Sequence, residues 1–160
     1  MIDKIISGGQ TGADQGGLRA GKRCGIPTGG MAPKGFLTET GPNPLLGSVY
    51  GLVESKSDKY PPRTKQNVKD SDGTIRFAVD FATAGEVLTL RLARECKRSH
   101  IDVDILDPIA HEVVAQWIRD NGVRVLNVAG NREKTHSGIA DFVEDYLCKV
   151  IQLLMDKQPT

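Results

Sequence analysis

The sequence contains few cysteines and few aromatic residues, and both shortages exclude classes of protein. Its three cysteines, Cys24, Cys96 and Cys148, are far apart in a chain of 160 residues. This number and spacing exclude a disulfide framework and a zinc-binding cluster, so we expect each to be a small buried residue at a helical position. Aromatic residues make up 5% of the chain and form no stacking platform for nucleic acid.

Net charge and long apolar runs are also lacking. The formal net charge is +1, which gives no electrostatic case for a nucleic-acid or membrane partner. No apolar run approaches the length of a membrane span, and Met1 to Lys4 leads into a strand without the apolar segment of a signal peptide. We therefore expect a cytoplasmic protein. Because no group of Cys, His, Asp and Glu has the spacing of metal ligands, we expect no protein-bound metal ion.

Strand and helix patterns alternate along the chain. We expect strands near residue 5 and over residues 74–79, 101–106 and 123–128, and helices over residues 14–24, 63–70, 86–99, 111–121 and 139–155. Asp107 and Pro108 form a helix-start signal before the fourth helix. The last helix carries an apolar stripe that is typical of a core or subunit contact and favours self-association. The alternation predicts one α/β domain over residues 1–160, with a mostly parallel sheet and helices on both faces.

A glycine-bearing loop follows the first strand. It contains Gly8, Gly9, Gln10, Thr11 and Gly12, and a helix begins at Asp14. A strand, a glycine turn and a helix together direct backbone N–H groups at an anion, so the loop predicts a phosphate cradle. The alternative is a tight turn that binds nothing. The spacing matches neither the Rossmann fingerprint nor the Walker loop.

Two further loops follow strands, over residues 80–85 and 129–138. Because the carboxyl ends of parallel strands meet at one edge of the sheet, we expect all three loops to converge there. Thr83, Ala84 and Gly85 stand at a helix N-terminus and form a second possible anion site. Arg132 and Lys134 can hold a phosphate, although a charged surface loop explains them equally well.

The segment over residues 25–74 is also unusual, because it is rich in turn residues and then in polar residues. Residues 25–62 hold seven glycines and six prolines with discrete turn signals, so we expect an ordered excursion over the first loop, with short strands near residues 28–31 and 50–54. Arg63 and Asn67 then share a helix face, where they could contact a ligand's phosphate or ring edge. The alternative is a solvated polar helix.

Glu86 stands at the start of the helix predicted over residues 86–99, where the helix dipole favours a negative charge. It could also act as an acid or base beside a bound sugar.

Four motifs stand out in the chain. They are Gly8-Gly9-Gln10-Thr11-Gly12-Ala13-Asp14, Pro33-Lys34-Gly35, Tyr60-x-x-Arg63-Thr64-x-x-Asn67-Val68-x-Asp70-Ser71-Asp72-Gly73-Thr74, and Leu126-Asn127-Val128-Ala129-Gly130-x-Arg132-Glu133. Together they resemble the molybdenum cofactor carrier proteins, a circularly permuted branch of the lysine-decarboxylase-like, nucleotide-binding Rossmann superfamily. The resemblance runs over residues 5–140, and the string from Arg63 to Thr74 is its most specific part.

The resemblance implies a Rossmann-like three-layer fold, usually a homotetramer, that binds the phosphorylated pyranopterin of molybdenum cofactor without chemical change. Such a protein would carry the cofactor and hand it on to molybdoenzymes; a dimer is the other assembly considered. The residues implied to bind cofactor are Gly8, Gly9, Gln10, Thr11, Gly12, Asp14, Lys34, Arg63, Asn67, Asp72, Thr83, Ala84, Gly85, Asn131, Arg132 and Lys134. The chain departs from the family pattern over residues 81–86, at Asn131 and at Lys134.

Three functional hypotheses follow. In the first, the protein binds the cofactor, with its phosphate at residues 8–12 or 83–85 and with Asn67 at the pterin edge. In the second, implied by the wider superfamily, the protein is an N-glycosidase of nucleoside monophosphates, in which Glu86 or Asp14 assists the departing base and Arg63 orients the substrate. In the third, it is a nucleotide sensor without catalysis.

Overall fold

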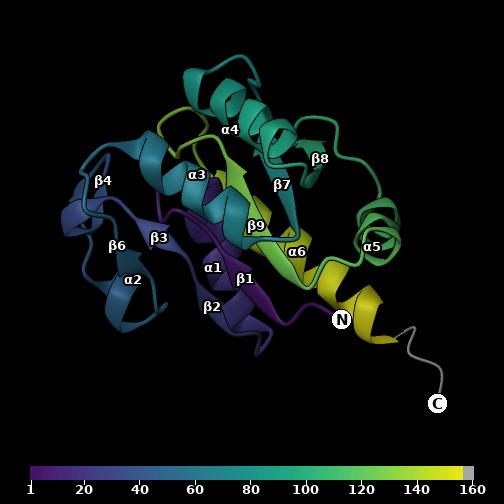
Figure 1. Cartoon of the computed structure of the whole chain (residues 1–160). Coiled ribbons are helices and arrows are strands. Elements are labelled where there is room, and N and C mark those ends of the chain that lie inside the picture. The colour runs from purple at the N-terminus through teal and green to yellow at the C-terminus, as the bar shows by residue number, and fades with distance from the viewer. Residues whose placement is uncertain (157–160) are drawn as a thin grey trace.

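A parallel sheet of five strands forms the middle layer of the protein (Figure 1). The computed structural model describes residues 1–156. The strand order is β2-β1-β9-β7-β8, and every neighbouring pair is parallel. The strands are β1 (Lys4–Ile6), β2 (Thr28–Gly29), β7 (Gly73–Ala78), β8 (Ser99–Asp104) and β9 (Val125–Gly130). The predicted α/β class is confirmed.

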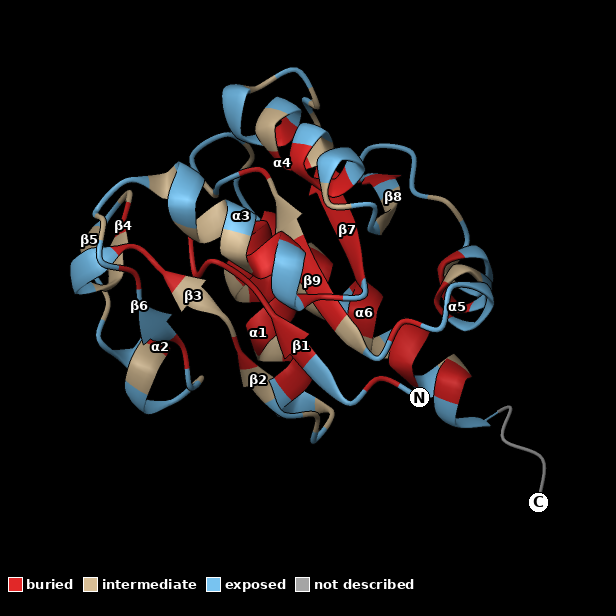
Figure 2. Cartoon of the chain, in the orientation of Figure 1, coloured by how far each residue is buried: buried red, intermediate tan, exposed pale blue. Residues whose placement is uncertain are grey.

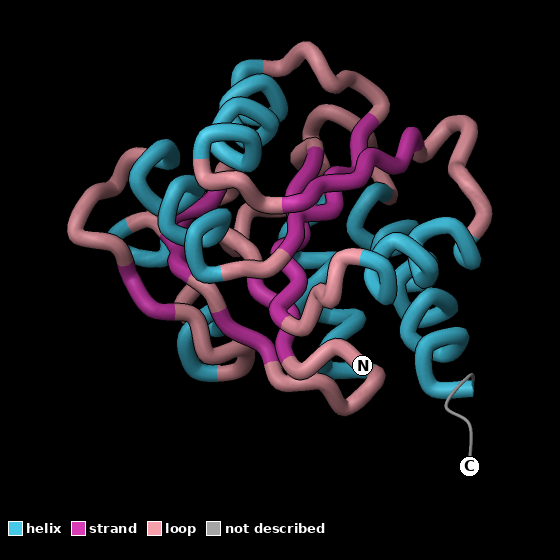
Figure 3. The backbone as a smooth tube through the Cα atoms, turned by 45° about the vertical axis from the view of Figure 1, so that its right-hand side comes forward, coloured by secondary structure: helices cyan, strands magenta, loops and turns pink. Residues whose placement is uncertain are grey.

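Helices cover both faces of this sheet (Figures 1 and 3). The helices α1 (Ala13–Arg23), α5 (His111–Asp120) and α6 (Ile139–Asp156) pack together on one face. The helices α3 (Tyr60–Asp70) and α4 (Ala84–Glu95) pack against each other on the opposite face. Among residues 1–156, no helix is long and apolar enough to cross a membrane.

The main core lies between the sheet and the α1, α5 and α6 layer. Ile75 and Phe77 of β7 and Leu126 and Val128 of β9 are fully buried there, because a strand covered by helices excludes water from both of its faces (Figure 2). The apolar stripe of α6 is buried in this core within the single chain. That stripe is therefore a core contact of the protomer.

The segment between β2 and α3 forms a lobe of short elements beside the sheet (Figure 1). Its elements are β3 (Met31–Ala32), η1 (Lys34–Phe36), β4 (Leu37–Thr38), β5 (Gly41–Pro42), α2 (Leu45–Ser48) and β6 (Val53–Glu54). Strand β3 pairs with β6, and β4 pairs with β5. Leu18 of α1 packs with Ala32, Leu46 and Leu52 in a small second core. The segment is thus the ordered excursion that its turn signals predict.

Several predicted boundaries differ from the structure. The strands predicted over residues 101–106 and 123–128 are β8 and β9 with the bounds above, and α3 begins at Tyr60, before the predicted residue 63. The helix α5 begins at His111 with Ala110 before it, so Asp107 and Pro108 lie in the preceding loop and do not start the helix. The helix α4 ends at Glu95 and not at residue 99, because Lys97 adopts a left-handed conformation with φ of 54° and the Arg98 N–H returns to the carbonyl of Ala93. This is a common way to end a helix.

Candidate functional site

The three loops meet at the carboxyl-terminal ends of the strands, because β1, β9 and β7 are neighbours in the sheet. Asn131, in the loop after β9, joins all three. Its Oδ1 accepts hydrogen bonds from the N–H groups of Val79 (2.9 Å) and Asp80 (3.1 Å), and its carbonyl accepts one from the Ala13 N–H (3.1 Å). The predicted convergence of the loops is confirmed.

Two adjoining cavities lie at this end of the strands. The deep cavity, of about 250 Å³, lies between α3, α4, β9 and the first loop. The outer cavity, of about 440 Å³, lies between the start of α4 and the loop after β9. Both are lined by Ala84, Gly85, Glu86, Gly130 and Arg132. A ligand with two chemically different parts can therefore occupy both.

The first loop uses its amide groups within the protein. The Gln10 N–H donates to Asp14 Oδ2 (3.1 Å), the Gly9 N–H to Ser7 Oγ (3.3 Å) and the Thr11 N–H to Gln10 Oε1 (3.0 Å). Asp14 is 4% exposed. Its carboxylate therefore stands where an anion held by this loop would stand.

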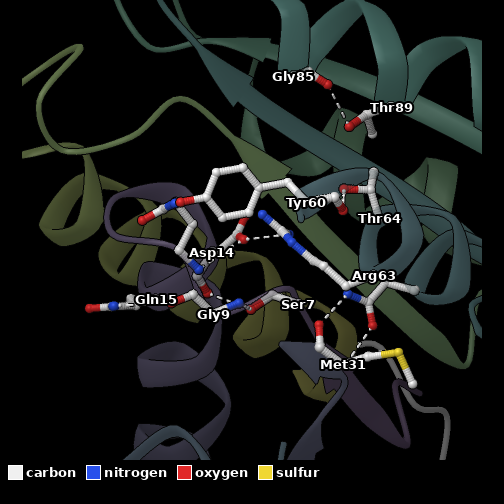
Figure 4. A network of polar contacts seen from close by, with 12 residues as sticks. Ser7, Gly9, Asp14, Gln15, Met31, Tyr60, Arg63, Thr64, Gly85 and Thr89 are labelled. Carbon is white, nitrogen blue, oxygen red and sulfur yellow. Dashed lines mark hydrogen bonds and ion pairs between the residues drawn. The ribbon is translucent and has the colours of Figure 1, made fainter. Parts of the chain in front are cut away.

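Arg63 of α3 reaches across the deep cavity to the first loop (Figure 4). Its Nη1 lies 3.2 Å from Asp14 Oδ2. The guanidinium lies against Gly8, where a Cβ atom would stand 1.5 Å from Nη1, so a side chain there would displace Arg63. The Tyr60 ring contacts two cations, with Cζ of Arg63 at 5.3 Å and Cζ of Arg132 at 4.9 Å from its centroid. Such contacts stabilise a guanidinium over an aromatic ring.

Burial dominates the protonation of the two carboxyl groups in the deep cavity. It raises the pKa of Asp14, against the opposing effects of Arg63 and of the Gln10 amide. Burial also raises the pKa of Glu86 to about 7, and the negative charge of Asp14 acts in the same direction, while Arg76 and Arg63 oppose it. Glu86 can thus hold or release a proton near neutral pH.

Several buried polar atoms at the cavities have no hydrogen-bond partner within residues 1–156. They are Gln10 Nε2, Arg63 Nε and Glu86 Oε1, from residues that line the deep cavity, and Glu39 Oε2, from a residue that lines the outer one. An unpaired buried polar group costs about 1–3 kcal/mol, so such groups at a cavity indicate a ligand that satisfies them. Two of the four are donors and two are acceptors.

The start of α4 is open to the outer cavity. An added Cβ atom at Gly85 would meet nothing within 4 Å. The first amides of a helix have no intrahelical acceptor and carry partial positive charge, and Arg132 and Lys134 line the same cavity. The start of α6 differs, because Glu133 accepts hydrogen bonds there from the N–H groups of Gly138 and Ala140. The α4 terminus is the one of this pair that can receive an external anion.

Comparisons with known proteins identify the family. Residues 5–151 match the model of the circularly permutated YpsA SLOG family. The chain belongs to this family. It is also similar to the crystal structure of a protein from Syntrophus aciditrophicus SB that is described as a putative molybdenum carrier protein. The identity is 38%, the match covers 93% of this chain and 94% of that chain, and the TM-score is 0.82. No curated protein matches the chain.

Most of the residues predicted for this family member's site lie at the two cavities. Gly8, Gln10, Asp14, Arg63, Asn67, Ala84, Gly85 and Arg132 line the deep cavity, and Thr83, Asn131 and Lys134 line the outer one with Ala84, Gly85 and Arg132. The amide of Asn67 is held by Met31, whose N–H donates to Oδ1 (2.8 Å) and whose carbonyl accepts from Nδ2 (3.0 Å).

Five predicted residues do not line either cavity. Gly9 packs against side chains of the lobe, Gly12 against the backbone after β9, and Thr11 donates to Glu39. Lys34 is an exposed residue of η1. Asp72 lies at the other end of the strands, just before β7 begins. Its carboxylate there accepts hydrogen bonds from the N–H groups of Arg124 and Val125.

Several residues of the site were not predicted, among them Tyr60, Arg76 and Glu39. Tyr60 stands in the motif that carries the resemblance, which was a usable signal. Arg76 interrupts an apolar strand, and the structure explains it: Nε and Nη2 bind Asp102 at 2.7 and 2.6 Å, and Nη1 holds the Glu86 carbonyl at 2.8 Å. Glu39 carries no signal of its own, because its contacts depend on how the lobe folds back. Within residues 1–156, no group of three or more His, Cys, Asp and Glu could hold a metal ion.

Proposed function

We propose that this protein binds molybdenum cofactor, a phosphorylated pyranopterin, and carries or protects it without chemical turnover. The observation that carries the proposal is the pairing of an open, positively charged helix start with a deep cavity whose buried donors have no partner within residues 1–156. The name of the S. aciditrophicus relative supports the same cargo.

In this proposal the cofactor's phosphate lies at residues 83–85 in the outer cavity. The α4 amides and the side chains of Arg132 and Lys134 neutralise it. The first loop is the weaker site, because its amides already bind Asp14 and other internal groups. The pterin ring enters the deep cavity beside Tyr60, with Gln10 Nε2 and Arg63 Nε as donors to it.

Assembly and transfer complete the proposal. We infer a homo-oligomer, a dimer or a tetramer, and molybdoenzymes as the recipients of the cofactor. Leu45, Val49 and Val53 are exposed apolar residues of the lobe, and we infer that a second copy covers them. Sedimentation of the purified protein tests the assembly.

The decisive experiment measures how long free molybdenum cofactor survives oxidation in air, by its ability to reconstitute a cofactor-free molybdoenzyme. The protein should slow the loss in a saturable way. Arg132→Ala should weaken this protection about tenfold or more, because a guanidinium bond to phosphate is worth about 1.5–3 kcal/mol. Arg124→Ala, at the other end of the strands, is the matched control. No saturable protection by the unmodified protein contradicts the proposal.

A second candidate function has one specific observation in its favour. Glu86, with its pKa raised to about 7, lies in the same cavity as Arg63, and a carboxyl group of that pKa can serve as a general acid or base near neutral pH. This arrangement fits an N-glycosidase of nucleoside monophosphates. Release of free base from AMP, lost in Glu86→Ala, would establish it, whereas an unchanged rate in that variant removes this mechanism. Binding of nucleotides without any base release would favour a sensor.

A further inference from the structure

Glu86 is the buried acceptor of the deep cavity that the protein leaves unpaired. It stands in the first turn of α4, is 3% exposed and lines both cavities, and its Oε1 has no hydrogen-bond partner within residues 1–156. Its backbone is fixed, because Arg76 holds its carbonyl and is itself held by Asp102. A rigidly placed acceptor of this kind indicates a ligand that donates hydrogen bonds.

Among the other polar side chains of the deep cavity, the unpaired buried atoms of Gln10 and Arg63 are donors, and several of the remaining side chains already bind groups of the protein. Both ends of the Asn67 amide bind Met31. The Asn127 amide donates to Thr74 Oγ1 at 3.2 Å. The Asp14 carboxylate accepts from Gln10 and Arg63. The Asn67 amide is therefore not free to bind a ring edge, and Glu86 is the carboxyl group of the deep cavity with an oxygen that has no partner within residues 1–156.

A carboxylate accepts two parallel hydrogen bonds when a ligand presents two adjacent donors. The 2-amino-4-oxopyrimidine edge, which pterins and guanine share, has a ring N–H beside an amino group. Adenine places an acceptor beside its amino group, and hypoxanthine has the N–H without the amino group. We propose that Glu86 selects the ring that this protein binds, by accepting both hydrogens of a 2-amino-4-oxopyrimidine edge. The inference rests on the proposed function and names the ring class that its deep cavity takes.

The charges around Glu86 give the inference a pH dependence of fixed sign. Asp14 faces it from α1, Arg63 from α3, Arg76 from β7 and Asp102 from β8. Its carboxyl group exchanges a proton near pH 7, mainly because it is buried. A ring edge that donates two hydrogens binds the ionised form, so its affinity should rise with pH through 7. A phosphate placed against Glu86 would need the protonated form, and its affinity would fall.

The experiment compares ligands that differ only at this edge. Fluorescence titration with pterin and with lumazine, which has an oxygen in place of the 2-amino group, is paired with calorimetry of GMP and IMP at pH 6 and pH 8. We expect the unmodified protein to bind each 2-amino compound about tenfold or more tightly than its partner at pH 8, and to lose most of this preference at pH 6. In Glu86→Gln the preference should fall to about threefold or less, while Glu95→Gln, an exposed residue of the same helix, keeps it.

The outcomes separate the inference from the proposed function. A preference that survives in Glu86→Gln, a preference that strengthens at pH 6, or equal binding within both pairs overturns the role of Glu86. A normal preference in a protein that gives molybdenum cofactor no protection keeps the ring assignment and overturns the cargo. The pH comparison uses the unmodified protein, so it decides the question even if the variant does not fold.

Discussion

The first loop and the start of α4 have the same design in sequence and opposite chemistry in the structure. Both place glycine at the start of a helix that follows a strand, Gly12 just before α1 and Gly85 in the first turn of α4. In the first loop, Asp14 accepts the Gln10 amide and binds Arg63, so the protein supplies the anion itself. At the start of α4, Gly85 faces open space, and the cavity beside it is lined by Arg132 and Lys134 as well as by Glu39 and Glu86. A glycine turn therefore shows where an anion can be held, and the neighbouring side chains decide whether it comes from outside.

Asp14→Ala should leave the first loop without its internal anion, and it should cause the largest loss of stability. Removing the carboxylate leaves Arg63 and the Gln10 N–H unpaired, so we expect the free energy of unfolding to fall by about 3–5 kcal/mol. Urea denaturation measures the loss. Inorganic phosphate should raise the midpoint of the variant more than that of the unmodified protein, because the ion can replace the missing carboxylate.

Two results would break this contrast. A stability equal to that of the unmodified protein would mean that Asp14 does not hold the loop. Equal stabilisation of both proteins by phosphate would mean that the first loop is no latent anion site. Asp141→Ala, which removes an exposed partner of Arg19, is the control and should change stability little.

The sequence predicts the fold well because hydrophobic periodicity is a local signal, and the convergence of the loops then follows from parallel topology. It could not show that the Asp14 carboxylate turns back into the loop, since a residue in a first helical turn can equally face solvent. It misplaced Asp72 for a simple reason: six residues of β7 separate Asp72 from the site, which at about 3.3 Å per residue is roughly 20 Å. The contacts of Glu39 and Arg76 could not be predicted, because the first depend on how the lobe folds and the second on the register between β7 and β8.

The protein should become less stable to unfolding as the pH rises, because of Glu86 at the start of α4. The pKa of Glu86 is raised from 4.5 to about 7, so the folded state keeps a proton that the unfolded state loses between these values. Its contribution is fully present below pH 4.5 and is lost as the pH rises to 7, with a total change of about 3 kcal/mol in the free energy of unfolding. Denaturation of the unmodified protein and of Glu86→Gln at pH 5 and pH 8 should show this difference.

A control on the same helix makes the pH comparison specific. Glu95→Gln changes an exposed carboxyl group of α4 and should leave the pH profile of the unmodified protein intact. If Glu86→Gln loses as much stability between pH 5 and pH 8 as the unmodified protein does, Glu86 does not carry a proton in the folded state. The start of α4 would then resemble the first loop, with its charges already balanced.

The glycines themselves give the most direct comparison of the two turns. Gly12 has φ of 83°, and an added Cβ would lie 2.4 Å from the Asn131 carbonyl oxygen. Gly12→Ala should therefore lower the free energy of unfolding by about 2–3 kcal/mol, through left-handed strain and the clash. Gly85→Ala, which meets nothing within 4 Å, should change it by about 0.5 kcal/mol or less. Thermal unfolding of the two variants side by side measures both effects, and similar losses would show that the α4 turn is as tightly packed as the first loop.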